Sequence, residues 1–223
     1  MALLRSWIGP WLCAVLTLPA SMSAQEIADI DYEHLSFRGF GFDWGYMYPD
    51  RVEPTATYAL RFDMGYAGPG LRIVPSLTYW KSPFEASKVT EFAERIADLV
   101  AAQTGGPPPT LDLGTIEYSD VALGLDGHVV WKTPFRLLTF GGLGVSAHFL
   151  NGSGPAIDGT FIDEQFDSVE PGFNLHLGGE LPLNERFRTY GVGRYEVMPD
   201  DRYFHVRVGW QLMTGPNAPG EVG

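Results

Sequence analysis

Bulky apolar residues alternate with small or polar residues along much of the chain. In the segment FRGFGFDWGYMY, residues 37–48, one face carries aromatic side chains, namely Phe40, Phe42, Trp44 and Tyr46. The opposite face is mainly glycine, namely Gly39, Gly41, Asp43 and Gly45. Successive side chains of a β-strand point to opposite sides, so this period of two predicts a strand with one aromatic face and one nearly bare face.

The same alternation recurs in seven further segments, so the chain is predicted to contain eight strands. The further segments are residues 57–66, 71–80, 117–131, 141–149, 173–181, 188–197 and 203–212. Each has close to the roughly 9–11 residues that a tilted strand needs to cross a bilayer. The segment at 188–197 is ambiguous, because its charged residues share a face with Tyr190 and Val192. A β-bulge near Gly191 or Gly193 could reset its register.

Short and longer connections alternate between the predicted strands. The segments AGPG, KTP and PLNE suit tight turns on one side, and mostly longer loops join the strands on the other side. The longest connection, residues 81–114, is predicted to contain an amphipathic helix from Glu85 to Ala102, which ends at TGGPPP. Its apolar residues at helical spacing are Val89, Phe92, Ile96, Leu99 and Val100. This apolar stripe could pack over the rim of a barrel or lie in the outer leaflet of a membrane.

The small residues indicate which face of each strand meets lipid. Glycine is disfavoured on a solvated strand, but it suits a narrow and crowded barrel interior. The other residues on the glycine-bearing faces are mostly charged or histidine, with both signs present. Only a closed barrel offers lipid an apolar belt without an exposed backbone edge. We therefore expect the aromatic faces to meet lipid, with Trp44, Tyr46, Trp131 and Tyr66 in two interfacial aromatic girdles.

The N-terminal segment MALLRSWIGPWLCAVLTLPASMSAQE indicates export. Arg5 precedes an apolar stretch, and small residues lead to Ala24, so residues 1–24 are predicted to be a signal peptide. An uncleaved anchor is the alternative. The barrel would then cover residues 25–214, followed by a short periplasmic tail at residues 215–223. The one cysteine, Cys13, falls within the predicted signal peptide, so the mature chain is expected to contain no disulfide.

The overall charge excludes one class of partner. The formal net charge is −12, which argues against nucleic acid, since phosphate binding needs a basic patch. No segment after the signal peptide has the roughly 20 apolar residues of a membrane-spanning helix.

The alternation over residues 35–213, which ends in VRVGWQLM, resembles the small eight-stranded bacterial outer-membrane barrels of the OmpA-transmembrane and OmpX-like group. The resemblance implies an all-β fold, an eight-stranded antiparallel up-and-down transmembrane β-barrel in the bacterial outer membrane. It also implies outer-membrane lipid or lipopolysaccharide and the barrel-assembly machinery as partners, a monomer, and no cofactor. One departure is that TGPNAPGEVG follows the last strand, where such barrels usually end on an aromatic residue.

Strand parity predicts which polar side chains point into the barrel. A charge in a narrow interior must be paired or hydrogen-bonded, so we expect an ion-pair network that plugs the barrel. The predicted members are Asp43, Arg61, Asp63, Arg72, Asp126, Arg136, Glu180, Arg188, Arg194, Glu196 and Arg207.

A plugged barrel would be a non-enzymatic protein of envelope integrity or of recognition through its surface loops, but alternatives stay open. The barrel could be a narrow solute pore. Ser146 and His148 could serve a lipid A-modifying enzyme, although inward residues do not reach lipid easily. His148, His176 and His205, with Asp43 or Glu196, could bind a divalent transition metal. The acidic loop at residues 157–170 could bind calcium, although its spacing fits no known calcium loop.

Overall fold

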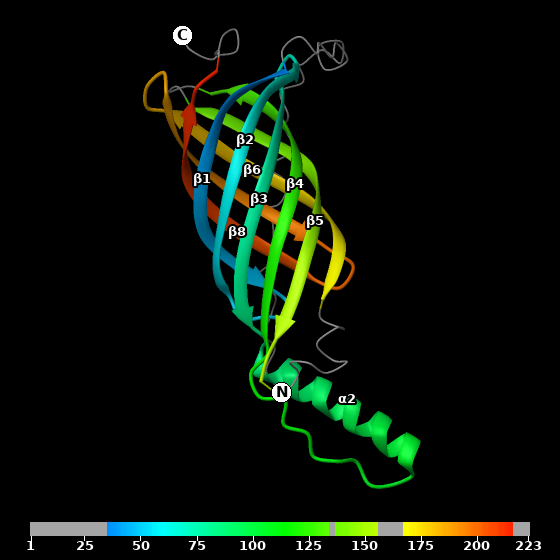
Figure 1. Cartoon of the computed structure of the whole chain (residues 1–223). Helices are drawn as coiled ribbons and strands as arrows, with labels where there is room; N and C mark the ends of the chain where they lie inside the picture. Colours follow the sequence, from blue (N-terminus) through cyan, green and yellow to red (C-terminus); the bar gives the residue numbers. More distant parts are fainter. Residues whose placement is uncertain (1–34, 134–136, 156–166, 216–223) are drawn as a thin grey trace, which may run out of the picture.

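The computed structural model describes residues 35–133, 137–155 and 167–215. Within these residues, eight strands form one closed antiparallel barrel, in which β8 pairs with β1 (Figure 1). The strands are β1 (Leu35–Pro49), β2 (Thr55–Gly68), β3 (Leu71–Pro83), β4 (Glu117–Lys132), β5 (Leu138–Ser153), β6 (Ser168–Pro182), β7 (Phe187–Val197) and β8 (Arg202–Met213). The predicted all-β up-and-down barrel is confirmed. The predicted signal peptide lies outside the described residues.

The predicted helix between the third and fourth strands is α2 (Ala86–Thr104). It runs two residues beyond the predicted end at Ala102 and stops at Gly105, whose φ of 69° is left-handed. The Gly105 N–H donates to the Ala101 carbonyl oxygen at 2.8 Å, which satisfies a carbonyl of the last turn. In Figure 1, α2 lies at the end of the barrel opposite to the tight turns, which the predicted topology makes the outer end.

No helix among the described residues has both the length and the apolar character that crossing a membrane requires.

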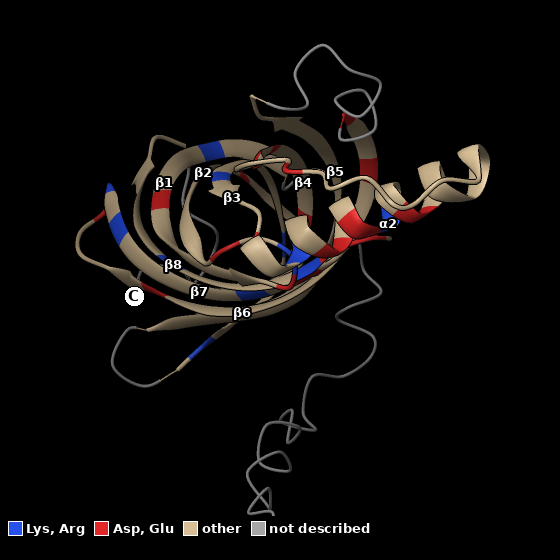
Figure 2. Ribbon diagram, turned by 90° about the horizontal axis from the view of Figure 1, so that it is seen from below, with Lys and Arg blue, Asp and Glu red and all other residues tan. Residues whose placement is uncertain are grey.

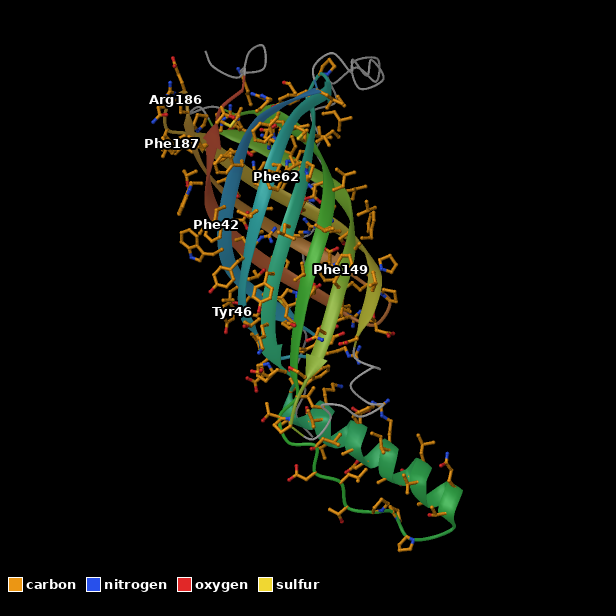
Figure 3. All side chains as sticks on the ribbon, in the orientation of Figure 1. Phe42, Tyr46, Phe62, Phe149, Arg186 and Phe187 are labelled. Carbon is orange, nitrogen blue, oxygen red and sulfur yellow. The ribbon has the colours of Figure 1, made fainter. Side chains whose placement is uncertain are left out.

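The strands turn their bulky apolar side chains away from the barrel, as predicted. Phe40 is 44% exposed, Trp44 is 43% exposed and Trp210 is 51% exposed. Figure 3 shows Phe42, Phe62 and Phe149 on the outer surface of the barrel. The glycine-bearing faces point inward, where charged and histidine side chains are almost fully buried. An apolar exterior around a polar interior is the arrangement of a barrel in lipid.

The prediction that Tyr66 lies in an aromatic girdle is wrong. The pairing of β2 with β3 shifts register between Arg61 and Tyr66, and Gly65 has a φ of 75°. Such an irregularity reverses the alternation of side chains, because the period of a strand is two. Tyr66 is therefore 9% exposed and lies inside, with the guanidinium carbon of Arg38 5.2 Å from the centroid of its ring.

The ambiguous seventh strand is regular. β7 keeps one continuous register with both β6 and β8, and no bulge occurs near Gly191 or Gly193. Its inward face therefore carries Tyr190 beside the charged residues, and Tyr190 is 3% exposed. The tyrosine shares the polar face because it packs against charged groups of the interior.

Interior glycines allow the strands to approach one another closely. A Cβ atom at Gly45 would overlap the carbonyl oxygen of Val206 and would lie 2.6 Å from the Cα of Arg207. Both are backbone atoms of β8, so they cannot move without disturbing the pairing of β1 with β8. The prediction that a crowded interior requires glycine therefore holds at Gly45, where the backbone of β8 leaves no room for a Cβ atom.

We predict that Gly45→Ala lowers the free energy of unfolding by about 1–3 kcal/mol, the usual cost of overpacking. Urea unfolding of the refolded barrel in detergent would measure this change. Gly191→Ala is the matched control, because its Cβ would lie 3.8 Å from Val208 Cγ1, an ordinary contact. Equal stability of the two variants would contradict the proposed strand contact.

Candidate functional site in the barrel interior

The interior contains the predicted charged residues, brought together from separate strands. All the predicted members except Arg136, which lies outside the described residues, are buried, with exposures of 6% or less. They form connected clusters rather than isolated pairs. The clusters follow one another from the end with the tight turns toward the end with α2.

Glu180 on β6 is the centre of the first cluster. Its carboxylate accepts hydrogen bonds from Arg72 Nη2 at 2.6 Å and Nη1 at 2.9 Å, and it also pairs with Arg61. Arg188 Nη1 lies 3.6 Å away from it. Glu180 is 0% exposed, so the desolvation of its charge is offset by three guanidinium groups.

Polar and aromatic groups complete this cluster. The side chain of Gln211 accepts from Arg61 Nη2 at 2.6 Å and donates to Asp63 Oδ2 at 3.1 Å. The guanidinium carbon of Arg61 lies 3.8 Å from the ring centroid of Tyr190, a cation–π contact. The ring of Phe140 stacks on His128 at 4.5 Å between centroids. These neutral groups fill the interior while they satisfy the charged ones.

Asp43 of β1 links Tyr190 to β8. The Tyr190 hydroxyl donates to Asp43 Oδ2 at 2.7 Å, and Arg207 Nε lies 2.8 Å from Asp43 Oδ1. Arg207 Nη1 also donates to Thr78 Oγ1 at 3.1 Å. The polar groups of β1, β3, β7 and β8 are thus joined across the barrel.

Arg194 of β7 joins two carboxylates in the next cluster. It donates from Nη1 to Asp126 Oδ2 and from Nε to Glu196 Oε2, both at 2.8 Å. Asn174 Nδ2 donates to Asp126 Oδ1 at 3.2 Å. His176 Nδ1 lies 2.8 Å from Asn174 Oδ1, so a histidine ends this chain of contacts.

Ser146, His148 and Asp120 lie in the order of a hydrolase triad. Ser146 Oγ is 2.9 Å from His148 Nε2, and His148 Nδ1 is 2.7 Å from Asp120 Oδ2. However, Ser146 Oγ also donates to Glu196 Oε1 at 2.5 Å. A serine that gives its proton to a carboxylate does not give it to the imidazole, so this arrangement differs from an activated nucleophile.

His148 itself lies between two carboxylates. Its Nε2 is 3.5 Å from Glu196 Oε1, on the opposite side of the ring from Asp120. Its two ring nitrogens thus face Asp120 on one side and Glu196 and Ser146 on the other. The indole of Trp80 donates to the same Asp120 oxygen at 3.0 Å. The group therefore resembles an ion-pair network more than a catalytic site.

The three candidate metal ligands do not meet. His148 bonds to Asp120, His176 bonds to Asn174, and His205 has no hydrogen-bond partner on either ring nitrogen among the described residues. In the described part of the chain, no group of three or more His, Cys, Asp or Glu residues is placed to hold a metal ion. Most of the predicted acidic loop at residues 157–170 lies outside the described residues.

Among the described residues, little free space is found between the charged clusters. One cavity of about 20 Å³ lies among the clusters, between Arg61, Asp126, His176, Arg194 and Arg207. This volume is close to the roughly 10–15 Å³ needed for one water molecule. Side chains rather than solvent therefore fill the middle of the barrel.

An apolar cluster closes the end of the barrel next to α2. Its buried members are Met47, Val52, Trp80, Phe84, Ala93, Leu113, Ile116, Tyr118, Leu150, Met198 and Tyr203. The loops that carry it are tied together, since Phe84 N–H donates to the Ile116 carbonyl and Glu53 N–H to the Pro83 carbonyl, both at 2.9 Å. Val89, Phe92 and Ile96 of α2 pack against the cluster. The first half of the helix thus covers the rim, one of the two predicted placements.

Several interior residues were not predicted as members of the network. Asp120 occupies an inward position of β4, and strand parity alone could have identified it as a member of the network. Trp80 and Phe140 are apolar, and nothing in their local sequence marks them as partners of charged groups. Arg38 faces inward only because the register of β1 shifts between Leu35 and Gly39.

Comparison with known proteins supports this fold. No protein-family model and no curated protein matches the sequence. Among solved structures, Neisserial surface protein A matches with a TM-score of 0.55 and 10% identity, over 79% of this chain and 97% of that one. The fold is that of a small outer-membrane β-barrel. The predicted resemblance is confirmed at the level of fold, and the apolar belt suits the bacterial outer membrane.

Two further outer-membrane barrels are similar at lower scores. Ail, the attachment invasion locus protein of Yersinia pestis, matches with a TM-score of 0.48 and 8% identity, over 81% of this chain and 99% of that one. A major outer membrane protein from Thermus thermophilus matches with a TM-score of 0.47 and 13% identity, over 79% of this chain and 99% of that one.

We predict that Glu180→Gln destabilises this outer-membrane barrel by about 3–5 kcal/mol, because it leaves buried arginines without their shared anion. Glu117→Gln is the control. Glu117 pairs with Lys81 at 2.5 Å, but both side chains are about half exposed, so its loss should cost less than about 1 kcal/mol. Urea unfolding in detergent would compare the two. A smaller loss for Glu180→Gln than for Glu117→Gln would contradict a central role for Glu180.

The stability of the barrel should also depend on pH through Asp201. Burial raises the pKa of Asp201, in the loop between β7 and β8, to about 6. The unfolded carboxyl loses its proton near pH 4, so the folded chain binds the extra proton between about pH 4 and 6, and stability should fall as pH rises through that range. Asp201→Asn should remove this contribution. Urea midpoints across this range would measure it, with Asp200→Asn, an exposed neighbour, as the control that should retain it.

Proposed function

We propose that this protein is a non-enzymatic protein of the bacterial outer membrane with a closed interior. Its role would be to support the envelope or to present its outer loops for recognition. The observation that carries the proposal is that, among the described residues, ion pairs surround a cavity of only about 20 Å³ and an apolar cluster lies over the outer end. Outer-membrane lipid and the barrel-assembly machinery are the partners that such a barrel requires, and it would act as a monomer.

A solute pore fits the interior less well. Glu180 and its three arginines stand across the barrel, and opening a path would break several buried ion pairs at once. The apolar cluster adds a second closure at the other end. The two closures oppose the passage of ions for different reasons. The Glu180 cluster blocks the path with buried ion pairs, and the apolar cluster excludes the water that an ion needs around it.

A lipid-modifying enzyme has one observation in its favour, the order of Ser146, His148 and Asp120. The same residues argue against it, because Ser146 bonds to Glu196 and His148 is fully buried in the interior. An acyl chain in the surrounding lipid would have to pass through the barrel wall to reach them.

The first test is planar-bilayer conductance of the refolded barrel. We predict no stable conductance steps above those of protein-free bilayers. A known channel-forming peptide in the same bilayers is the positive control that the assay detects conducting steps. Regular ion-conducting steps from the unaltered protein would overturn the closed interior.

The second test is the turnover of labelled lipid A by the refolded protein. We predict that the unaltered protein and Ser146→Ala both remain at the background rate. Turnover by the unaltered protein that Ser146→Ala abolishes would instead establish the enzyme. Circular dichroism of both samples ensures that a difference does not come from misfolding.

A further inference from the structure

A groove lies outside the barrel, between α2 and the chain that returns from it. Its volume is about 490 Å³, within the range of roughly 300–1,000 Å³ that is typical of ligand sites. Figure 1 shows α2 projecting from the end of the barrel, with the returning segment beside it. The groove is lined by side chains of α2 between Ala86 and Asp98 and by residues 108–114.

The walls of the groove are apolar and held in place. Ala93 and Ala97 on α2 are small, and Leu111 and Leu113 face them from the returning segment. Val89, Ala93, Leu111 and Leu113 also belong to, or pack against, the apolar cluster that closes the barrel. The near end of the groove is thereby fixed to the barrel. The far part of α2 is less covered, since Leu99 is 64% exposed.

The rim of the groove is acidic. Glu94, Asp98 and Asp112 line it and are exposed, and no lysine or arginine is among its lining residues. The described loops and the rest of α2 at this end of the barrel are acidic as well, with Asp50, Glu53, Glu85, Glu91, Asp167, Asp200 and Asp201 against Arg51, Lys88 and Arg95. Figure 2, which views the barrel from this end, shows acidic residues along α2.

This charge decides between possible occupants. The phosphate groups of lipopolysaccharide are anionic, and a second copy of this chain carries a formal net charge of −12, so both are repelled. A cationic partner is attracted by the rim. The apolar walls require that such a partner also offer apolar side chains, as an amphipathic helix does when it binds in a groove.

We propose that the groove between α2 and residues 108–114 binds a basic amphipathic peptide segment. The proposal rests on the proposed function, because it names the class of partner that the outer loops would recognise. The apolar side chains of the peptide occupy the space between Ala97 and Leu111, and its cationic side chains pair with Glu94, Asp98 and Asp112. The barrel serves to hold this groove at the outer surface.

Fluorescence anisotropy would test the proposal with the whole refolded barrel in phosphatidylcholine nanodiscs. The probe is a labelled helical peptide of Lys and Leu, and empty nanodiscs measure its affinity for lipid. We expect saturable binding above that background, weakened by added salt. The triple variant Glu94→Gln, Asp98→Asn and Asp112→Asn should weaken binding by about tenfold at low salt.

A matched control removes the same charge elsewhere at this end. Glu53→Gln, Glu91→Gln and Asp200→Asn do not line the groove, so together they should weaken binding by about twofold or less. Equal losses in the two triple variants would overturn the groove, since only long-range attraction would then operate. Equal binding of a Glu and Leu peptide would overturn the role of the acidic rim.

A second pair of variants tests the space itself. Thr90→Trp places a large side chain in the groove, whereas Ser87→Trp places one on an exposed part of α2 that does not line it. Loss of binding with Thr90→Trp alone is expected, and unchanged binding with Thr90→Trp would overturn the proposal.

The two proposals can fail separately. If conductance appears while the peptide binds as expected, the closed interior is wrong and the groove stands. If the barrel is closed and the peptide does not bind, only the groove fails.

Discussion

The structure depends on neutralising charge inside a barrel that is too narrow for solvent. Eight strands enclose little more than their own side chains. An ionised group in the interior is therefore stabilised by neighbouring side chains and not by water. Glu180 on β6 meets this constraint with Arg61 of β2, Arg72 of β3 and Arg188 of the neighbouring strand β7. The pairs with Arg61 and Arg72 therefore also hold β6 to β2 and β3 across the barrel. Removal of one partner would leave the others buried and unpaired.

The need to pair every interior charge also distinguishes the interior of the barrel from its outer surface. A filled interior offers little to a substrate, and Ser146 and His148, despite their order, are held by Asp120 and Glu196 within the ion-pair network. The apolar cluster then closes the outer end and gives α2 a surface on which to pack. What remains free for interaction is the outer surface. In the proposed function, the barrel anchors the groove beside α2.

The barrel fold could be predicted from sequence because its signal is local. Alternation along β8 places Val206, Val208 and Trp210 on one face whatever the neighbouring strand does. The interior positions of Asp43, Arg72 and Glu180 follow from the same parity. Strand parity is not enough where the pairing of neighbouring strands is irregular or where an interior side chain packs against a charged group. Tyr66 turns inward at an irregularity of β2, and β7 stays regular although Tyr190 shares a face with charges, because Arg61 packs on its ring.

The sequence by itself determined the strands, their two faces, the position of α2 and the need for paired charges, since each depends on periodicity or on the chemistry of single side chains. Only the tertiary structure decided the partners. That Glu180 meets three arginines, that Trp80 donates to Asp120, and that Leu111 faces Ala97 across a groove all depend on strand register and on the path of the loops. These contacts join residues of different strands and segments, and no local pattern encodes the distance between them.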